Sequence, residues 1–359
     1  APSSLSSLST AEYWSVVNTG TLSAATVSAA KASIGSFDAI GSSTTLAGTY
    51  TNLGGSVTNT LITSNTVTAG TTVGSLSTTT YFVLGVKVPA PTITSFTASS
   101  GYVGTTISIT GTNLTNASAV TIGGVAAASY TVNSATSISA VVAAGGATGT
   151  ISVTTPGGTA TSSSSFTFNG YVSTQDGDWN TAATWLGGAV PPASSTVTIN
   201  HAVTVNASVT NAPSSVTVNS TKSLTFGASG ALTATTVTNN GSIVMTAGGT
   251  LTIASGGTLA NGSNTFTRGS GTVAFAGSGT VTGTIGFNDV TLAGGVNFGT
   301  ASTINGTLTI NSGGFANTNA PIYASGSTLK YSTGGGYGRG TEWSTTTGAG
   351  YPHHVQIST

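Results

Sequence analysis

The segment Asp176–His201 reads DGDWNTAATWLGGAVPPASSTVTINH, and the character of the chain changes there. The sequence before it has the turn spacing of β-sandwich domains, whereas the sequence after it predicts a run of short strands rich in Val, Thr and Gly. Tryptophan buries a large apolar area, and an open stack of strands needs its end covered. We therefore predict that Trp179 and Trp185 form a hydrophobic cap over the first turn of a β-solenoid.

The residues that follow the two tryptophans complete this prediction. Pro191 and Pro192 are expected to fix the path into the first turn, and Val197–Asn200 is the expected first strand of the stack. The alternative is a surface loop that carries two tryptophans incidentally.

Hydrophobic triplets such as VTI, VTV, LTF and LTI recur through residues 170–359, separated by Gly-Gly, Asn-Gly and Ser-Gly turns. The corresponding positions Val197, Val216 and Val237 return every 19 to 21 residues, a period at the lower end of the solenoid range. The central Thr of a triplet would point outward, and the flanking Val, Ile or Leu would stack inward on the neighbouring turns. From Phe287 the pattern loosens, but we still assign strands of the stack there.

Asparagines follow the first strands of successive turns. Asn200, Asn219 and the pair Asn239-Asn240 occupy comparable points in the repeat. This placement predicts side-chain amides that form ladders along the turns.

Composition restricts both the class of protein and its partners. The chain has 359 residues, of which 3% are charged, with six basic and six acidic side chains and no cysteine. An ordinary globular protein has about 25% charged residues. A clustered basic surface for nucleic acid or anionic lipid is therefore excluded, and so are disulfides and thiol chemistry. A hydrophobic fraction of 38% with Val and Thr in alternation argues against disorder.

The first 88 residues have the rhythm of many short strands. AEYWSVV (Ala11–Val17) and TTYFVLGVKV (Thr79–Val88) are the most aromatic segments and the expected core strands, while Ala25–Ser36 is a weak helix candidate. The segment resembles the last part of a small β-sandwich that recurs in large secreted proteins of Bacteroidetes and ends in a motif like YFVLG. That resemblance implies a domain truncated at its N-terminus.

Residues 89–169 follow a linker marked by Pro89 and Pro91. Ile107, Ile109 and Leu114 are expected to face the core, and Gly123-Gly124 is expected to form a two-residue hairpin turn. The segments PTITSF, GYVGTTISITGTNL, VTIGGVAA, GTISVTTPGGTAT and FTF resemble an IPT/TIG domain, an immunoglobulin-like sandwich. In extracellular bacterial proteins, such domains serve as spacers or binding modules.

Residues 170–359 resemble β-helical segments of Bacteroidetes surface adhesins. The motifs that carry the resemblance are DGDW, TWLGGAVP, VTI and VTV, the strands GGTLTI and GTLTI, and the later RGTEW and GYP. It implies an extracellular protein exported by the secretion machinery of those bacteria. Because the chain stops within an expected strand, we also expect a piece of a longer protein whose solenoid continues past Thr359.

No group of residues has the pattern of a catalytic, cofactor or metal site. Asp176 and Asp178 are the only close carboxylate pair, and we interpret them as turn residues that bond their own backbone. His353 and His354 would point to opposite faces of a strand, so one ion could not use both, and His201 is isolated. No GxSxG elbow accompanies the many serines.

Scattered ionic residues support neither catalysis nor strong ion pairing. Arg339, Glu342 and Lys330 are expected to form at most a local, solvated ion pair. A polysaccharide lyase would need charges clustered on one face of the solenoid. Lys222, Arg268 and Asp289 are too dispersed for that.

These observations predict an all-β chain with Ig-like sandwich modules at 1–88 and 89–169 and a parallel β-solenoid at 170–359. The predicted function is that of a non-enzymatic, extracellular structural or adhesive protein, part of a long surface adhesin or a fibre subunit. Its expected partners are surface glycans or other copies of itself, with no nucleic acid, membrane insertion or cofactor.

Three alternatives remain open. A glycan-binding module would use the aromatic residues that gather late in the chain, Tyr323, Tyr331, Tyr337 and Trp343, unless these pack the core or the end of the solenoid. Ice binding is suggested by the outward threonines, but it requires a flat, regular face that the loose pattern after Gly283 does not favour. The third is a degraded or unrecognised carbohydrate-active enzyme, that is, a β-helix enzyme that acts on polysaccharides.

Overall fold

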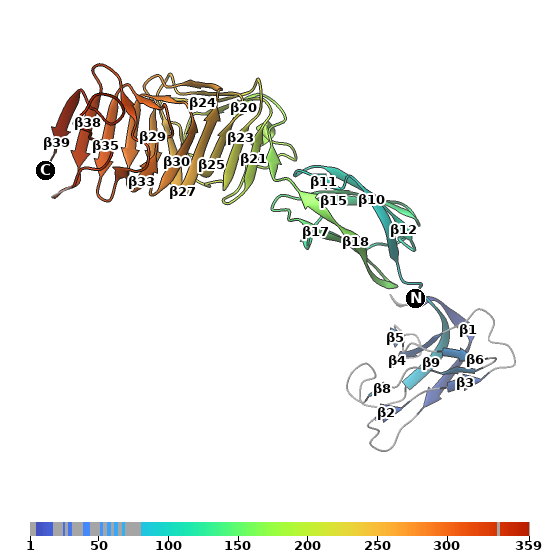
Figure 1. Ribbon diagram of the computed structural model, residues 1–359. Helices are drawn as coiled ribbons and strands as arrows, with labels where there is room; N and C mark the ends of the chain where they lie inside the picture. The colour runs from blue at the N-terminus through green and yellow to red at the C-terminus, as the bar shows by residue number, and fades with distance from the viewer. Residues whose placement is uncertain are drawn as a thin grey trace. The chain divides into compact units, whose positions relative to one another are not determined.

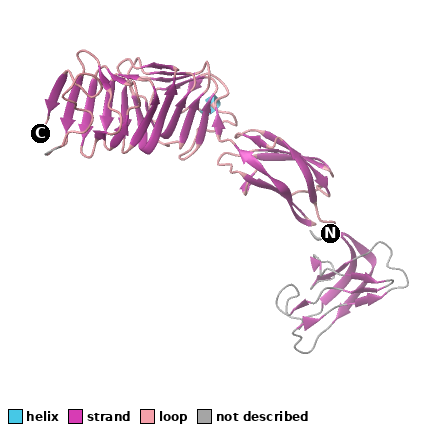
Figure 2. Cartoon of the chain, in the orientation of Figure 1, coloured by secondary structure: helices cyan, strands magenta, loops and turns pink. Residues whose placement is uncertain are grey.

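The computed structural model describes the backbone of eight short strands before residue 69 and of residues 80–335 and 338–358, and the side chains of residues 88–335 and 338–358. Almost every regular element is a strand (Figure 2), and the helical structure described is one 3-10 turn, Ala182–Thr184. The predicted all-β class is confirmed. The chain forms two compact units, composed of residues 1–99, 106–141 and 147–167 and of residues 100–105, 142–146 and 168–359. The division into three domains at residues 88 and 169 stays a prediction.

The described residues among the first 87 form nine strands. They are β1 (Leu5–Val16), β2 (Ala24–Ala25), β3 (Ser28–Ala30), β4 (Ala39–Ser43), β5 (Thr51–Asn52), β6 (Ser56–Thr58), β7 (Leu61–Thr63), β8 (Val67–Thr68) and β9 (Thr80–Lys87). Residues 11–16 of the first aromatic segment lie in β1 and residues 80–87 of the second form β9. The two strands pair antiparallel, with Trp14 opposite Phe82. Strand β3 lies within the weak helix candidate Ala25–Ser36, so a helix over that whole segment is wrong.

The next nine strands build an antiparallel sandwich (Figure 1). They are β10 (Thr92–Thr97), β11 (Ser100–Gly101), β12 (Thr106–Thr112), β13 (Ala119–Ile122), β14 (Val125–Ala126), β15 (Ser129–Ser134), β16 (Ser137–Val141), β17 (Gly149–Thr155) and β18 (Gly158–Phe168). One sheet has the order β10-β12-β16-β15 and the other β11-β18-β17-β13-β14.

The residues expected in the sandwich core are buried. Ile107 and Ile109 have no exposed surface, because alternate positions of β12 face inward, and Leu114, just after β12, is equally buried. Gly123 and Gly124 have φ of 59° and 81°, and they join paired residues of β13 and β14. Positive φ at both central residues is what a two-residue hairpin turn requires.

The remaining strands form the solenoid. They are β19 (Tyr171–Val172), β20 (Gly177–Asp178), β21 (Thr196–Ile199), β22 (Ala202–Val205), β23 (Ser215–Val218), β24 (Ser223–Phe226), β25 (Ala231–Asn239), β26 (Ser242–Val244), β27 (Thr250–Gly262), β28 (Thr265–Thr267), β29 (Thr272–Phe275), β30 (Gly279–Gly283), β31 (Gly286–Phe287), β32 (Asp289–Leu292), β33 (Gly295–Asn297), β34 (Thr303–Ile304), β35 (Thr307–Asn311), β36 (Phe315–Ala316), β37 (Ile322–Tyr323), β38 (Thr328–Ser332) and β39 (His354–Ile357). These strands pair with one another in parallel, and an isolated antiparallel bridge joins Ser173 to Trp185.

The solenoid strands pair in three long ladders, which we call its faces (Figure 1). The first face runs β19-β21-β23-β25-β27-β30-β33-β36, and the second runs β20-β22-β24-β26-β28. The third runs β25-β27-β29-β32-β35-β38-β39, since β25 and β27 are long enough to take part in two faces. A short ladder, β31-β34-β37, completes the later turns.

The core consists of apolar side chains stacked from turn to turn. On the first face Val197, Val216 and Val237 pair in sequence, as the 19-to-21-residue period predicts, and Leu259 and Val281 continue the stack. All five side chains are at most 1% exposed. Alternation of inward Val or Leu with outward Thr is therefore the pattern that builds this fold.

The solenoid begins one strand earlier than expected. Tyr171 of β19 pairs in parallel with Val197 and is 1% exposed, so Val197–Asn200 is the second level of the first face, and naming it the first strand was wrong. A two-residue strand with one aromatic side chain lacks the repeated triplet that identifies the other levels. Sequence reasoning therefore missed Tyr171.

Asparagine amides link successive turns at the ends of the first-face strands. Asn219 Nδ2 donates to Asn200 Oδ1 at 2.6 Å, and Asn239 Nδ2 donates to Asn261 Oδ1 at 2.7 Å. Asn239 and Asn261 are each 1% exposed, so these amides lie inside the stack. The predicted amide ladder is confirmed between Asn200 and Asn219, whereas Asn239 bonds to Asn261, a residue outside the prediction. These hydrogen bonds help to fix the register of the first face.

Candidate functional site

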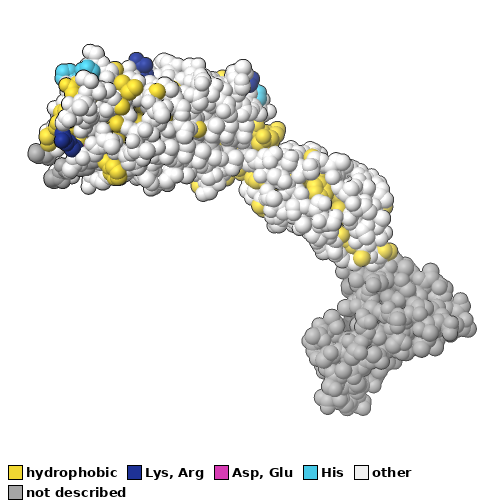
Figure 3. All heavy atoms as spheres, in the orientation of Figure 1, with side chains coloured by type: hydrophobic (Ala, Val, Ile, Leu, Met, Phe, Trp, Pro, Cys, Tyr) yellow, Lys and Arg dark blue, Asp and Glu magenta, His cyan; other side chains and the backbone are white. Residues whose placement is uncertain are grey.

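Two rows of hydroxyl side chains cover the first face between β21 and β30. One row is Thr196, Ser215, Thr236, Thr258 and Thr280, and the other is Thr198, Thr217, Thr238, Ala260 and Thr282. All ten positions are exposed or half-buried. The surface of the solenoid over these strands is almost entirely white in Figure 3, because hardly any hydrophobic or charged side chain lies on it. We call these ten residues the threonine face.

The third face also carries outward threonines, but its rows are interrupted. Asp289 stands between Thr272 and Thr307, and Lys330 follows Thr309. Charged side chains hold their own hydration shells and break the repeat of hydroxyl groups. The rows of the threonine face, which contain no charged residue, are therefore more regular than those of the third face.

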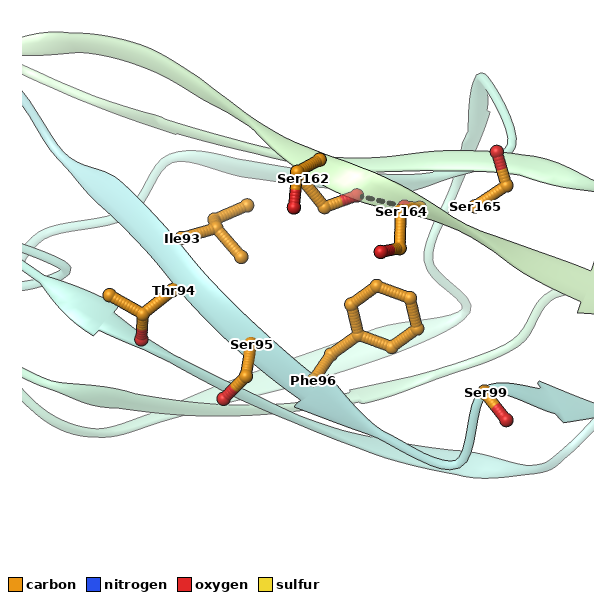
Figure 4. Close-up of a pocket in the computed structure, with 9 residues that line it drawn as sticks. Ile93, Thr94, Ser95, Phe96, Ser99, Ser162, Ser164 and Ser165 are labelled. Atoms are coloured by element: carbon orange, nitrogen blue, oxygen red, sulfur yellow. Dashed lines mark hydrogen bonds between the residues drawn. The ribbon is translucent and has the colours of Figure 1, made fainter.

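A hollow of about 230 Å³ lies in the sandwich between β10 and β18 (Figure 4). Its lining is Ile93–Phe96, Ser99 and Ser162–Ser165. Phe96 is half-buried and points from β10 toward the serines of β18. An aromatic ring beside several hydroxyl groups suits a neutral, hydroxylated ligand.

A β-bulge opens this hollow. Along β18 the pairing with β17 jumps from Thr161 to Ser165, so the residues between them have no partner in the β17 register. The Ser162 hydroxyl fills the gap, accepting from Ile151 N at 2.9 Å and donating to Ser164 O at 2.7 Å. Bulges of this kind turn side chains away from the regular alternation of a strand.

The aromatic residues expected to contact glycan occupy different environments. Tyr323 and Tyr331 are 5% and 4% exposed, so their ring faces are not available to a sugar. Assigning these two to a glycan surface was wrong, because they pack in the core of the last turns. Trp343 is half-buried, with its ring centroid 5.8 Å from that of Tyr331, and Tyr337 lies outside the described residues.

Glu342 holds this C-terminal cluster together. Its side chain is fully buried and accepts hydrogen bonds from Ala316 N at 2.8 Å, Gly340 N at 2.7 Å and the Tyr331 hydroxyl at 3.0 Å. The expectation of a solvated ion pair for Glu342 was wrong. Three donors from different parts of the last turns take the place of water around the carboxylate. Hydrogen bonds of this kind stabilise a charged group inside a protein.

The hydroxyl of Tyr323 also serves the cluster. It donates to the backbone oxygen of Glu342 at 3.0 Å. Burial, reinforced by the negative charge of Glu342 and by Tyr331, raises the pKa of Tyr323 far above its ordinary value. The group therefore stays protonated and keeps its role as donor, which indicates structure and not acid–base chemistry.

The two aspartates near the solenoid start are structural. Asp178 Oδ1 accepts from Asn180 N at 2.9 Å, two residues on, as a turn residue does. Its Oδ2 accepts from Asn206 N at 3.2 Å, and Asp176 Oδ1 accepts from Ala202 N at 2.8 Å. Asp178 thus bonds local backbone as a turn residue does, whereas the hydrogen bond of Asp176 goes to the next turn of the solenoid. Both carboxylates tie β20 and its neighbours to that next turn.

The histidines do not converge. The ring nitrogen Nδ1 of His201 lies 2.9 Å from Ser173 O, and His353 and His354 are exposed at the other end of the solenoid. Among the described residues, no three His, Asp or Glu side chains lie close enough to hold a metal ion. Within the same residues, no helix has the length and apolar character to span a bilayer.

Comparison with known proteins gives one domain match and several distant structural likenesses. A comparison with curated proteins finds no match. SGBP-B from a complex xyloglucan utilization locus in Bacteroides uniformis is 14% identical, with 43% of this chain and 48% of that chain covered and a TM-score of 0.21. A structure with xylogluco-oligosaccharide is 23% identical, with 43% and 39% covered and a TM-score of 0.22. This chain spans less than half the length of either protein, and likenesses at this level carry no argument about function.

The domain match agrees with the geometry of the sandwich. Residues 91–169 match the IPT/TIG domain, and this range takes in both antiparallel sheets from β10 to β18. The chain thus contains an IPT/TIG domain, with the immunoglobulin-like fold that the sequence predicted, followed by a parallel β-solenoid.

Proposed function

We propose that this chain is a structural and adhesive part of an extracellular protein, without enzymatic activity. The observation that carries the proposal is the solenoid itself, whose stacked core runs through parallel ladders beneath a surface of neutral hydroxyls. Such a surface can meet glycans or other chains without the cost of stripping water from charges. The described carboxylates serve turns and packing, which supports a role that does not involve catalysis.

The last strand of the solenoid suggests how copies could associate. Val355 and Ile357 of β39 continue the core columns of Leu329 and Tyr331, yet they are 38% and 70% exposed. A further strand on the outer edge of β39 would cover them, and head-to-tail addition that does not close produces a filament. We propose that a further strand pairs there, supplied by a continuation of the solenoid or, in the 359-residue chain taken alone, by a second copy.

We expect purified chain to form longer particles as its concentration rises, seen by negative-stain electron microscopy and sedimentation velocity. Ile357→Asp places a charge on the apolar edge and should keep the chain as single particles. Thr309→Asp, on an outward position of the third face, is the control and should assemble like the wild type. Single particles of wild type at every concentration would exclude self-association.

Glycan binding is the second candidate function, favoured by the hollow beside Phe96. We expect Phe96→Ala to abolish binding of the chain on an array of neutral glycans, because it removes the ring that faces the serines. Phe315→Ala is the matched control, since Phe315 is an exposed phenylalanine of the solenoid. An array without hits for wild type, or equal loss in both variants, would exclude this site.

A further inference from the structure

The threonine face is a two-dimensional lattice of identical chemical groups. Along the stack its residues repeat at the strand spacing of about 4.8 Å, and within a strand they repeat every second residue, at about 6.6 Å. Eight of the ten positions are threonine, one is serine and one is alanine. Each hydroxyl can donate and accept a hydrogen bond, and each threonine adds a methyl group beside it.

The strands that carry this lattice are fixed by core packing and by hydrogen bonds, without any partner. Beneath it lie the valines and leucines of the first-face core, packed turn on turn with almost no exposed surface. The amide bonds Asn219–Asn200 and Asn239–Asn261 fix the turns at the strand ends. Threonine is β-branched and has few χ1 rotamers in a strand, so its hydroxyls lose little entropy on binding.

A partner that matches such a lattice must itself have a repeating surface. A flexible glycan or a single protein offers no fixed repeat of hydrogen-bonding groups at these spacings. Two neutral solids do, namely ice and crystalline polysaccharide. None of the ten positions is aromatic, so the face lacks the rings that stack on sugars in polysaccharides. None is charged either, so no ionic hydration shell disturbs an ordered layer of water on the face.

We infer that the threonine face binds ice, through water molecules ordered on its rows of threonine hydroxyl and methyl groups. The irregular repeat that argues against this activity begins only after Gly283, where Asn297 and then Phe315 enter the first face. The five levels from β21 to β30 precede it and stay in continuous register. The inference goes beyond the proposed structural role, since single chains and assembled chains both present this face.

The test is thermal hysteresis and partition into growing ice, measured on the 359-residue chain. Wild type is expected to lower the freezing point below the melting point and to enter the ice fraction. Thr217→Tyr should remove most of both effects, because a large ring within the lattice, at the second of its five levels, keeps ice at a distance. Tyrosine favours strands, so the variant should fold, as an unchanged melting temperature would show.

Thr309→Tyr is the matched control. Thr309 is also a half-buried, outward, mid-strand threonine, but it lies on the third face beside Lys330. It should retain wild-type hysteresis and ice partition. Absence of both effects in the wild type, equal loss in the two variants, or binding to crystalline cellulose or chitin without binding to ice would each overturn the inference. None of these results bears on whether copies assemble through β39.

Discussion

Replacing Glu342 with alanine should lower the free energy of unfolding of the solenoid by about 3 to 5 kcal/mol, the usual cost of breaking a buried charged network. The variant removes the carboxylate that accepts from Ala316 N, Gly340 N and the Tyr331 hydroxyl. Each buried donor left unsatisfied costs about 1 to 3 kcal/mol. Urea unfolding followed by tryptophan fluorescence measures the change, and amide hydrogen exchange in β38 locates it.

Two milder variants separate the carboxylate from the space that it fills. Tyr331→Phe removes one of the three donors and should cost about 1 kcal/mol. Glu342→Gln keeps the volume of the side chain but replaces one oxygen with an NH2 group that faces a backbone N–H. Its loss of unfolding free energy should therefore lie between those of Glu342→Ala and Tyr331→Phe. If Glu342→Ala unfolds within about 0.5 kcal/mol of the wild type, the cluster does not stabilise the last turns.

The second large effect is expected at the other end of the solenoid. Trp179 and Trp185 are at most 1% exposed, and their rings meet edge to face at 5.0 Å between centroids. Trp179→Ala should destabilise the first turns by about 3 to 5 kcal/mol, since it leaves a cavity where a large ring was packed. Thermal unfolding with hydrogen exchange in β20 and β22 would measure this, and it tests the capping role predicted for the pair.

The two tryptophans offer an internal control. Trp185 Nε1 donates to Trp179 O at 2.8 Å, whereas Trp179 Nε1 has no acceptor among the described residues. Phenylalanine keeps most of the apolar area but loses the N–H group. Trp185→Phe should therefore cost about 1 kcal/mol more than Trp179→Phe. Equal costs would show that the indole hydrogen bond does not contribute to the cap.

The repeat in the sequence predicts the solenoid well because inward and outward positions differ in chemistry. Val216 and Val237 lie where the period puts them, and the glycine hairpin of the IPT/TIG domain forms as its residues require. These features depend on neighbours in the sequence or on one repeated spacing. Patterns of that kind are visible without coordinates.

Features that depend on distant contacts were not predictable in this way. Glu342 is one of six acidic residues in the chain and lies in a polar segment. Nothing local shows that Ala316 N, 26 residues earlier, donates to it. Burial of Tyr323 and Tyr331 follows from that same closure of the last turns. The hollow beside Phe96 depends on a bulge in β18, which a run of serines does not reveal. In each case the determining partner lies on another strand.

The uneven length of the solenoid turns has an engineering consequence. Val273 and Val290 pair in adjacent turns although 17 residues separate them, while Leu251 and Val273 pair across 22. The corners absorb the difference and the strands keep their alignment. Foreign peptides grafted into these corners should therefore be displayed at evenly spaced intervals along a stiff, neutral support, without disturbing the scaffold beneath them.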